Sequence, residues 1–94
     1  MIKSFDLLYK SVSSNGVYLV EDTHANYWSD WEGGLRKNDT FMEFSKEKTD
    51  EINAVHTRGA LPPTEFTAST DSITFYDSIV VFEKRPQGFR QALV

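Results

Sequence analysis

Two carboxylates, a histidine and two aromatic residues directly follow one short apolar stretch of this sequence. The stretch is Val17–Val20, and the residues after it with chemically useful side chains are Glu21, Asp22, His24, Tyr27 and Trp28. Carboxylate oxygens are ligands for hard cations, and an imidazole can act as a ligand or contact a substrate. Aromatic faces suit the apolar side of a sugar ring. These residue types are therefore candidates for a binding site.

Each of these residues also has an ordinary structural explanation. The carboxylate pair could be the solvated end of a strand, and His24 could be a surface histidine. Tyr27, Trp28 and Trp31 could anchor a long loop by packing against it, instead of stacking on a sugar. The residue types alone leave both explanations open.

The preceding residues predict a helix that leads directly into a strand. Residues 1–13 carry apolar side chains at helical spacing, and Asn15 or Gly16 is suited to end that helix. Val17–Val20 does not alternate between apolar and polar residues, which predicts a strand covered on both faces. Residues 23–38 then form a loop that contains two adjacent glycines.

A second helix is predicted from residue 40 to about residue 55. Thr40 and Glu43 have the spacing of a capping box, with Asp39 as a competing cap. The side chains expected to face inward are Phe41, Phe44, Ile52 and Val55. Polar residues lie near that apolar stripe, namely Ser45, Lys48 and Thr49.

The rest of the chain predicts a connection and a hairpin. Residues 56–70 form the connection, because Pro62-Pro63 excludes a helix or a central strand there. Ile73–Tyr76 and Ile79–Phe82 are predicted strands, joined by a tight turn at Asp77-Ser78.

The composition of the 94 residues predicts one domain spanning residues 1–94, with residues 86–94 as a tail. The formal net charge of −4 argues against non-specific binding to nucleic acid. No apolar run is long enough to span a membrane, and the N-terminus does not resemble a signal peptide. Cysteine is absent, which excludes thiol chemistry. We expect a cytoplasmic protein.

The order of these elements, together with four sequence stretches, resembles the C-terminal third of class I S-adenosylmethionine-dependent methyltransferases. The resemblance is strongest to the metal-dependent macrolide-sugar O-methyltransferases of the macrocin and mycinamicin type. The stretches are "GVYLVEDTHANYW", the Gly-Gly loop, "TFMEF" and "FYDSIVVFEK", and the similarity extends from Ile2 to Arg85.

This resemblance implies an α/β fold, a partial Rossmann-like methyltransferase fold with two helices. Its three-stranded mixed sheet would have the strand order 1-3-2, with the last strand antiparallel. Ligands of such sheets bind beyond the carboxyl ends of the strands, where Glu21 and Asp22 lie. By resemblance these two residues hold Mg²⁺ against the hydroxyls of a sugar acceptor. Neighbouring strand residues point to opposite faces, so both can reach one ion only if the chain bends there.

The resemblance also indicates what the sequence lacks. The glycine-rich turn and the acidic residue that hold the cofactor in the family have no counterpart. We therefore expect a truncated methyltransferase that is inactive alone and binds S-adenosylmethionine only with a partner. Pairing through an exposed sheet edge would give a homodimer or a complex with a separate N-terminal methyltransferase portion. The alternative is a non-catalytic dimeric interaction or ligand-binding module derived from a methyltransferase. The candidate substrate contacts are His24, Tyr27 and Trp28.

Overall fold

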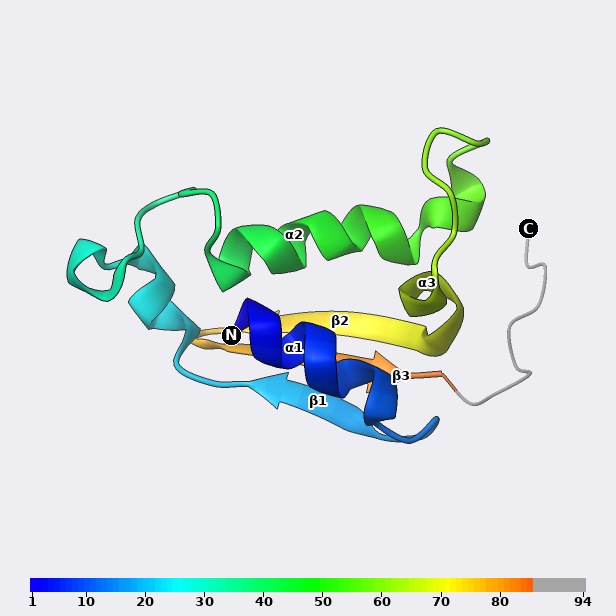
Figure 1. Cartoon of the computed structure of the whole chain (residues 1–94), viewed down its shortest axis with the longest axis horizontal. Coiled ribbons are helices and arrows are strands. Elements are labelled where there is room, and N and C mark those ends of the chain that lie inside the picture. Colours follow the sequence, from blue (N-terminus) through cyan, green and yellow to red (C-terminus); the bar gives the residue numbers. More distant parts are fainter. Residues whose placement is uncertain (86–94) are drawn as a thin grey trace.

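The computed structural model describes residues 1–85, and the predicted tail, residues 86–94, lies outside the described residues. The main elements in chain order are α1 (Ile2–Leu8), β1 (Val17–Val20), α2 (Phe41–Ile52), α3 (Glu65–Ser69), β2 (Thr70–Tyr76) and β3 (Ile79–Lys84). Helices α1 and α2 lie beside the sheet formed by the three strands (Figure 1). Within residues 1–85 no helix has both the length and the apolar character needed to cross a membrane.

The sheet has the strand order β1-β3-β2, as predicted. Strand β3 pairs antiparallel with both of its neighbours, and Phe82 at its centre lies opposite Tyr18 of β1 and Ile73 of β2. Strands β1 and β2 therefore run parallel to each other but are separated by β3. Because the antiparallel strand occupies the middle, every hydrogen-bonded pairing in this sheet is antiparallel.

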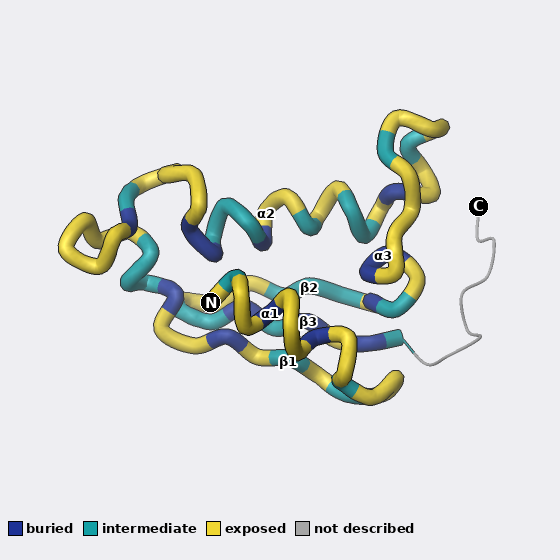
Figure 2. The backbone as a smooth tube through the Cα atoms, viewed as in Figure 1, coloured by how far each residue is buried: buried dark blue, intermediate teal, exposed yellow. Residues whose placement is uncertain are grey.

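An aromatic cluster fills the space between the helices and one face of the sheet. Phe82 is fully buried, and the ring of Phe5 from α1 lies 4.6 Å from it, centre to centre. Phe5 also stacks on Tyr9 at 4.6 Å, while Phe41 and Phe66 bring α2 and α3 into the same cluster. The buried segments of these elements accordingly face one another in Figure 2. This cluster, and not helix propensity, fixes the short helix α1 against the sheet.

The prediction that both faces of Val17–Val20 are covered is wrong. The burial of β1 alternates, with Val17 and Leu19 57% and 49% exposed while Val20 is buried. Tyr18 and Val20 share the face of Phe82 and Val80, which the helices cover. The opposite face carries no helix among residues 1–85, so an apolar run here does not mean two covered faces.

Helix α2 begins where the sequence predicted but ends earlier. Thr40 is the N-cap and accepts a hydrogen bond from the Glu43 amide at 3.2 Å. The Glu43 carboxylate pairs with Lys46 instead of returning to the cap. The predicted inward position of Val55 is wrong: it is exposed, because a 3₁₀ turn (Ala54–His56) follows α2 and rotates Ala54 into the core.

A short helix, α3, lies inside the segment that the sequence analysis assigned to a connection. Thr64 and Thr67 form a complete capping box at its start. The Thr67 hydroxyl also donates to the Glu51 carbonyl at 2.7 Å, which joins α3 to the end of α2. Pro62-Pro63 precedes this helix. The prediction that no helix forms therefore holds at the two prolines but is wrong for Glu65–Ser69.

Candidate functional site

The chain leaves the sheet at the end of β1 through a sharp bend. Asp22 has a φ of 60°, in the left-handed region, and a 3₁₀ turn (Thr23–Tyr27) follows at once. Asparagine and aspartate enter this region more readily than most other non-glycine residues. The bend that the two carboxylates need in order to converge is therefore present, and it is centred on Asp22. It ends the strict alternation that would hold Glu21 and Asp22 on opposite faces.

Both carboxylates of the bend are exposed to solvent. Within residues 1–85 the side chains of Glu21 and Asp22 form no hydrogen bond or ion pair with another residue. The described part of the chain also contains no group of three or more histidine or acidic side chains placed to hold a metal ion. Mg²⁺ is commonly bound by one or two carboxylates together with water and substrate oxygens. Two carboxylates alone would leave most coordination positions of such an ion to water, substrate or residues outside this segment.

His24 is attached to the hairpin turn between β2 and β3. Its Nδ1 lies 3.0 Å from the Ser78 hydroxyl oxygen, and the backbone N–H of Thr23 donates to the Ser78 carbonyl at 3.0 Å. The imidazole and the Trp28 ring pack in a T-shaped arrangement at a centre-to-centre distance of 5.0 Å. The turn residue Ser78 therefore positions the loop that follows β1, a role that the sequence analysis did not assign to it.

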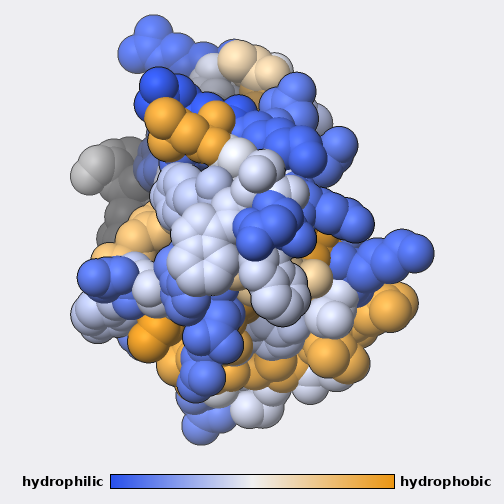
Figure 3. All heavy atoms as spheres, turned by 90° about the vertical axis from the view of Figure 1, so that its left-hand side faces the viewer, coloured by the Kyte–Doolittle hydropathy of each residue, from blue (hydrophilic) through white to orange (hydrophobic). Residues whose placement is uncertain are grey.

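The aromatic residues of this loop are exposed more than is usual for packing residues. Tyr27 and Trp28 are each nearly half exposed, and Trp31 is 68% exposed. Figure 3 views this end of the molecule, where pale aromatic side chains lie among charged and apolar ones. The arrangement leaves ring surface free to stack on a ligand. Trp28 combines this exposure with its contact to His24.

Asn26 and Gly33 close the same loop on itself. The Gly33 amide donates to the Trp28 carbonyl and the Gly34 amide to the Asn26 carbonyl, both at 2.8 Å. The Asn26 side chain accepts from the Met42 amide at 2.9 Å, so it satisfies a free N–H in the first turn of α2. Asn26 is not recognisable as a cap in the sequence, because a cap supplied by a residue 16 positions away leaves no local pattern.

A cavity of about 440 Å³ opens between this loop and the starts of α1 and α2. Its lining includes Asn26, Trp31, Gly33, Asp39 and Thr40. Trp31 is the one aromatic of the loop that reaches it, whereas Glu21, Asp22 and His24 do not line it. The predicted site residues therefore gather at the end of β1, next to this cavity and not inside it.

Comparison with known proteins gives a structural match and no sequence match. No protein-family model matches the chain, and no curated protein matches it. The MycE methyltransferase from the mycinamycin biosynthetic pathway, in complex with Mg and SAH, superposes with a TM-score of 0.77 at 20% identity over 94% of this chain. The complex of MycE with Mg, SAH and mycinamycin VI gives 0.75 at 22% identity, also over 94% of this chain.

The superposed region is 24% of the MycE chain in the first of these complexes and 23% in the second. The chain therefore spans about a quarter of the length of the protein that it matches. The resemblance noted in the sequence is confirmed at the level of the fold, including the strand order and the antiparallel last strand. This chain has the fold of a quarter-length segment of a mycinamycin-pathway methyltransferase.

Proposed function

We propose that this chain is the acceptor-side part of an S-adenosylmethionine-dependent O-methyltransferase that acts on a sugar hydroxyl. The observation that carries the proposal is the superposition of 94% of the chain on MycE at a TM-score of 0.77. The carboxylate bend at the end of β1 supports it, because ligands of open α/β sheets bind at that end of the strands. The MycE complexes contain Mg, SAH and, in one, mycinamycin VI.

In this proposal Glu21 and Asp22 contribute carboxylate ligands to Mg²⁺. Both are exposed and, within the described residues, free of competing ion pairs. A bound Mg²⁺ supplies Lewis acidity, which lowers the pKa of a coordinated acceptor hydroxyl. The remaining coordination positions are left to water, the acceptor and residues outside this segment. His24, Tyr27 and Trp28 contact the sugar from the adjoining loop.

S-adenosylmethionine binding belongs, in this proposal, to a larger assembly. The 94 residues hold no glycine-rich turn between a strand and a helix to approach the cofactor. Residues beyond this segment, in the same polypeptide or in a separate chain, complete the pocket. The isolated segment is accordingly expected to be inactive.

Manganese, used as a paramagnetic probe for the magnesium site, tests the metal ligands. Substoichiometric Mn²⁺ is expected to broaden the backbone NMR signals of residues 21–24 first, and Mg²⁺ is expected to reverse the effect. The double variant Glu21→Gln, Asp22→Asn should abolish this local broadening. The matched control is Glu47→Gln, Asp50→Asn, which removes the same charge from exposed positions on α2. Equal broadening in both variants would contradict the assignment.

Calorimetry tests the cofactor part separately. Titration of S-adenosylmethionine into the isolated chain, with and without Mg²⁺, is expected to give no binding heat. Micromolar affinity would show that the cofactor pocket is complete within these residues. That result would overturn the assignment to the acceptor side.

A second candidate function, a non-catalytic dimeric interaction module, is favoured by the free edge of β1. Among residues 1–85, strand β1 pairs with β3 alone, and Val17 and Leu19 expose apolar surface beside its other edge. Exposed strand edges recruit further strands. The same edge suits a separate N-terminal methyltransferase portion, so this surface serves both candidates.

Sedimentation velocity distinguishes pairing through β1 from association elsewhere. The chain is expected to sediment as a dimer, and Leu19→Lys is expected to make it monomeric, because a lysine beside the edge opposes pairing. Leu7→Lys is the control, since Leu7 is also an exposed leucine but belongs to α1 and not to the strand. If both variants dissociate alike, or neither does, β1 is not the interface.

A further inference from the structure

We propose that Asp77 and Ser78 act as positioning residues that hold His24 in the tautomer protonated on Nδ1, leaving Nε2 as the acceptor for a ligand hydroxyl. The identity of that ligand as a sugar rests on the proposed function. The tautomer rests only on the hydrogen bonds of the turn.

Two hydrogen bonds meet at the hydroxyl group of Ser78. Its hydroxyl donates to the Asp77 carboxylate at 3.0 Å, and a serine hydroxyl has only one hydrogen to donate. The same oxygen lies 3.0 Å from Nδ1 of His24, so toward the imidazole it acts as the acceptor. Nδ1 therefore carries the hydrogen. In a neutral imidazole the lone pair is then on Nε2.

The backbone holds this chain of bonds in place. Ser78 has a φ of 66°, a left-handed conformation that few serines adopt outside turns. The Thr23 N–H donates to the Ser78 carbonyl at 3.0 Å, immediately before His24 in the sequence. The turn and the loop are therefore joined by a backbone bond and a side-chain bond at consecutive residues. Such double attachment fixes the imidazole ring relative to the turn.

The surroundings of His24 suit a hydroxylated ligand. The imidazole is half-buried and packs against the partly exposed Trp28 ring in a T-shaped arrangement, and Tyr27 adds further exposed aromatic surface. A sugar stacked on these rings presents hydroxyl donors at its rim, and Nε2 is an acceptor for one of them. The tautomer thereby selects a donor group and disfavours a ligand that offers only acceptors at this position.

Long-range ¹H–¹⁵N NMR of the imidazoles reads the tautomer directly. At about pH 8.5, His24 is expected to show the Nδ1–H pattern. His56 is an internal reference, because it is exposed and its side chain has no hydrogen-bond partner within residues 1–85. His56→Asn assigns the signals. An Nε2–H pattern for His24 would overturn the proposal.

Two variants test the roles of the positioning residues. Asp77→Ala frees the Ser78 hydroxyl to donate to Nδ1, so His24 is expected to change to the Nε2–H tautomer while the hairpin remains folded. Ser78→Ala removes the acceptor and is expected to leave a mixture of tautomers. Asp6→Ala, an exposed carboxylate on α1, is the charge-matched control and should change nothing. Retention of the Nδ1–H tautomer in Asp77→Ala would also overturn the proposal.

Titration with a methyl glycoside separates this inference from the proposed function. The amide signals of residues 24–28 are expected to shift, and Asp77→Ala is expected to weaken that binding about tenfold, the effect of one lost hydrogen bond. If the tautomers behave as expected but no glycoside binds, the sugar acceptor is wrong and the positioning role stands. Glycoside binding of equal strength in both proteins would overturn the ligand role of Nε2.

Discussion

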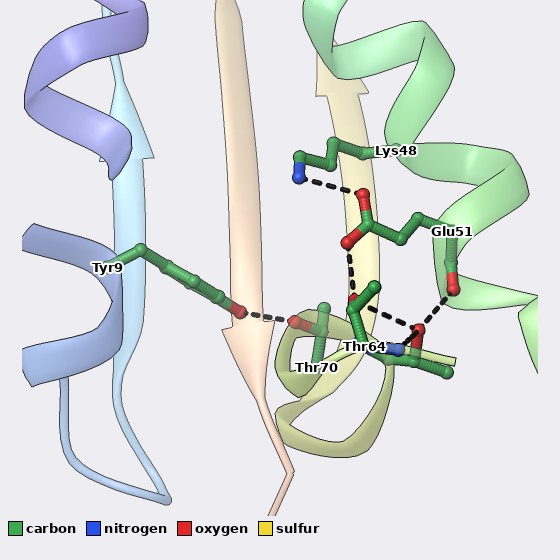
Figure 4. A network of polar contacts seen from close by, with 6 residues as sticks. Tyr9, Lys48, Glu51, Thr64 and Thr70 are labelled. Atoms are coloured by element: carbon green, nitrogen blue, oxygen red, sulfur yellow. Dashed lines mark hydrogen bonds and ion pairs between the residues drawn. The ribbon is translucent and has the colours of Figure 1, made fainter. Parts of the chain in front are cut away.

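Tyr9 and Thr70, 61 residues apart in the sequence, share a buried hydrogen bond of 2.8 Å between their hydroxyl groups (Figure 4). The bond joins the turn after α1 to the first residue of β2. Thr70 is fully buried and Tyr9 nearly so. Burial raises the pKa of Tyr9 above its ordinary value, and the hydrogen bond to Thr70 offsets part of that rise. The pair is a buried polar contact that joins the N-terminal segment to the sheet.

Tyr9→Phe is expected to destabilise the protein by about 1–3 kcal/mol, because it leaves the buried Thr70 hydroxyl without its partner. The ring stacking with Phe5 survives this substitution, so the loss reports the hydroxyl alone. Urea unfolding followed by circular dichroism measures the change. Thr70→Val should cost a similar amount.

The double variant Tyr9→Phe, Thr70→Val provides the control. It is expected to be more stable than the sum of the single effects by about 1 kcal/mol, because no buried hydroxyl is then left unpaired. Strictly additive effects would mean that the two hydroxyls do not interact in solution.

Glu51 links α2 to the start of α3, and it makes the stability of that link depend on pH. Its carboxylate accepts from the Lys48 ammonium at 2.8 Å and from the Thr64 hydroxyl (Figure 4). Burial alone would raise the pKa of Glu51, but the hydrogen bonds from Lys48 and Thr64 outweigh it and lower the pKa below 4.5. The folded state therefore favours the charged form. The resulting stabilisation is present above pH 4.5 and is lost as the pH falls through the lowered pKa.

Glu51→Gln is expected to reduce stability by about 1 kcal/mol at neutral pH, and this deficit should shrink as the pH falls through the lowered pKa of Glu51. Unfolding free energies measured between about pH 3 and pH 7 give the pH dependence of stability for the wild type and for the variant. Glu47→Gln is the control, since Glu47 is exposed on the same helix. If the stability deficit of Glu51→Gln stays constant across that range, it comes from the changed shape of the side chain and not from the lost charge.

The predictable part of the fold is the part that local pattern controls. The apolar stripe of residues 1–13 predicts a helix, although α1 ends at Leu8 and a 3₁₀ turn (Tyr9–Ser11) follows it. The cap at Thr40 likewise predicts the start of α2. The two apolar runs around Asp77-Ser78 likewise specify the hairpin, although β2 begins earlier, at Thr70, and β3 ends later, at Lys84. The strand order came from the family resemblance, because no local pattern states which strand lies in the middle.

The unpredictable part depends on contacts between distant residues. Val17 and Leu19 have the composition of a buried strand, yet their exposure depends on which face of the sheet the helices cover. Ser45 in the polar middle of α2 is fully buried. Its hydroxyl is satisfied there because it donates to the Met42 carbonyl of its own helix. At the site, the residue types of Glu21 and His24 could be read from the sequence. The attachment of His24 to Ser78 required the fold.

Gly33→Ala is expected to destabilise the protein by about 1–3 kcal/mol, because the loop cannot accept a side chain there. A Cβ at residue 33 would lie 2.1 Å from the Asn26 carbonyl oxygen and 2.9 Å from that of Ala25. These are backbone atoms, so the whole turn would have to move. Gly34→Ala is the matched control, since its nearest neighbour is the flexible Lys37 side chain at 3.3 Å. Thermal unfolding should separate the two variants, and equal losses would contradict the close approach.

Lys84→Met is expected to stabilise the protein by up to about 1 kcal/mol, because a well-packed apolar side chain replaces a buried charge. Lys84 is 8% exposed, and its ammonium lies 4.3 Å from the centre of the Tyr9 ring.

Burial lowers the pKa of Lys84 below 10.5, and the charge of Glu65 offsets only part of that effect. The charged form is therefore disfavoured in the folded state, and wild-type stability should rise as the pH increases from the lowered pKa toward 10.5. The advantage of Lys84→Met should shrink over the same range, whereas the exposed control Lys3→Met should show no such trend. A destabilised Lys84→Met variant would mean that the attraction between the ammonium and the Tyr9 ring outweighs the cost of burying the charge.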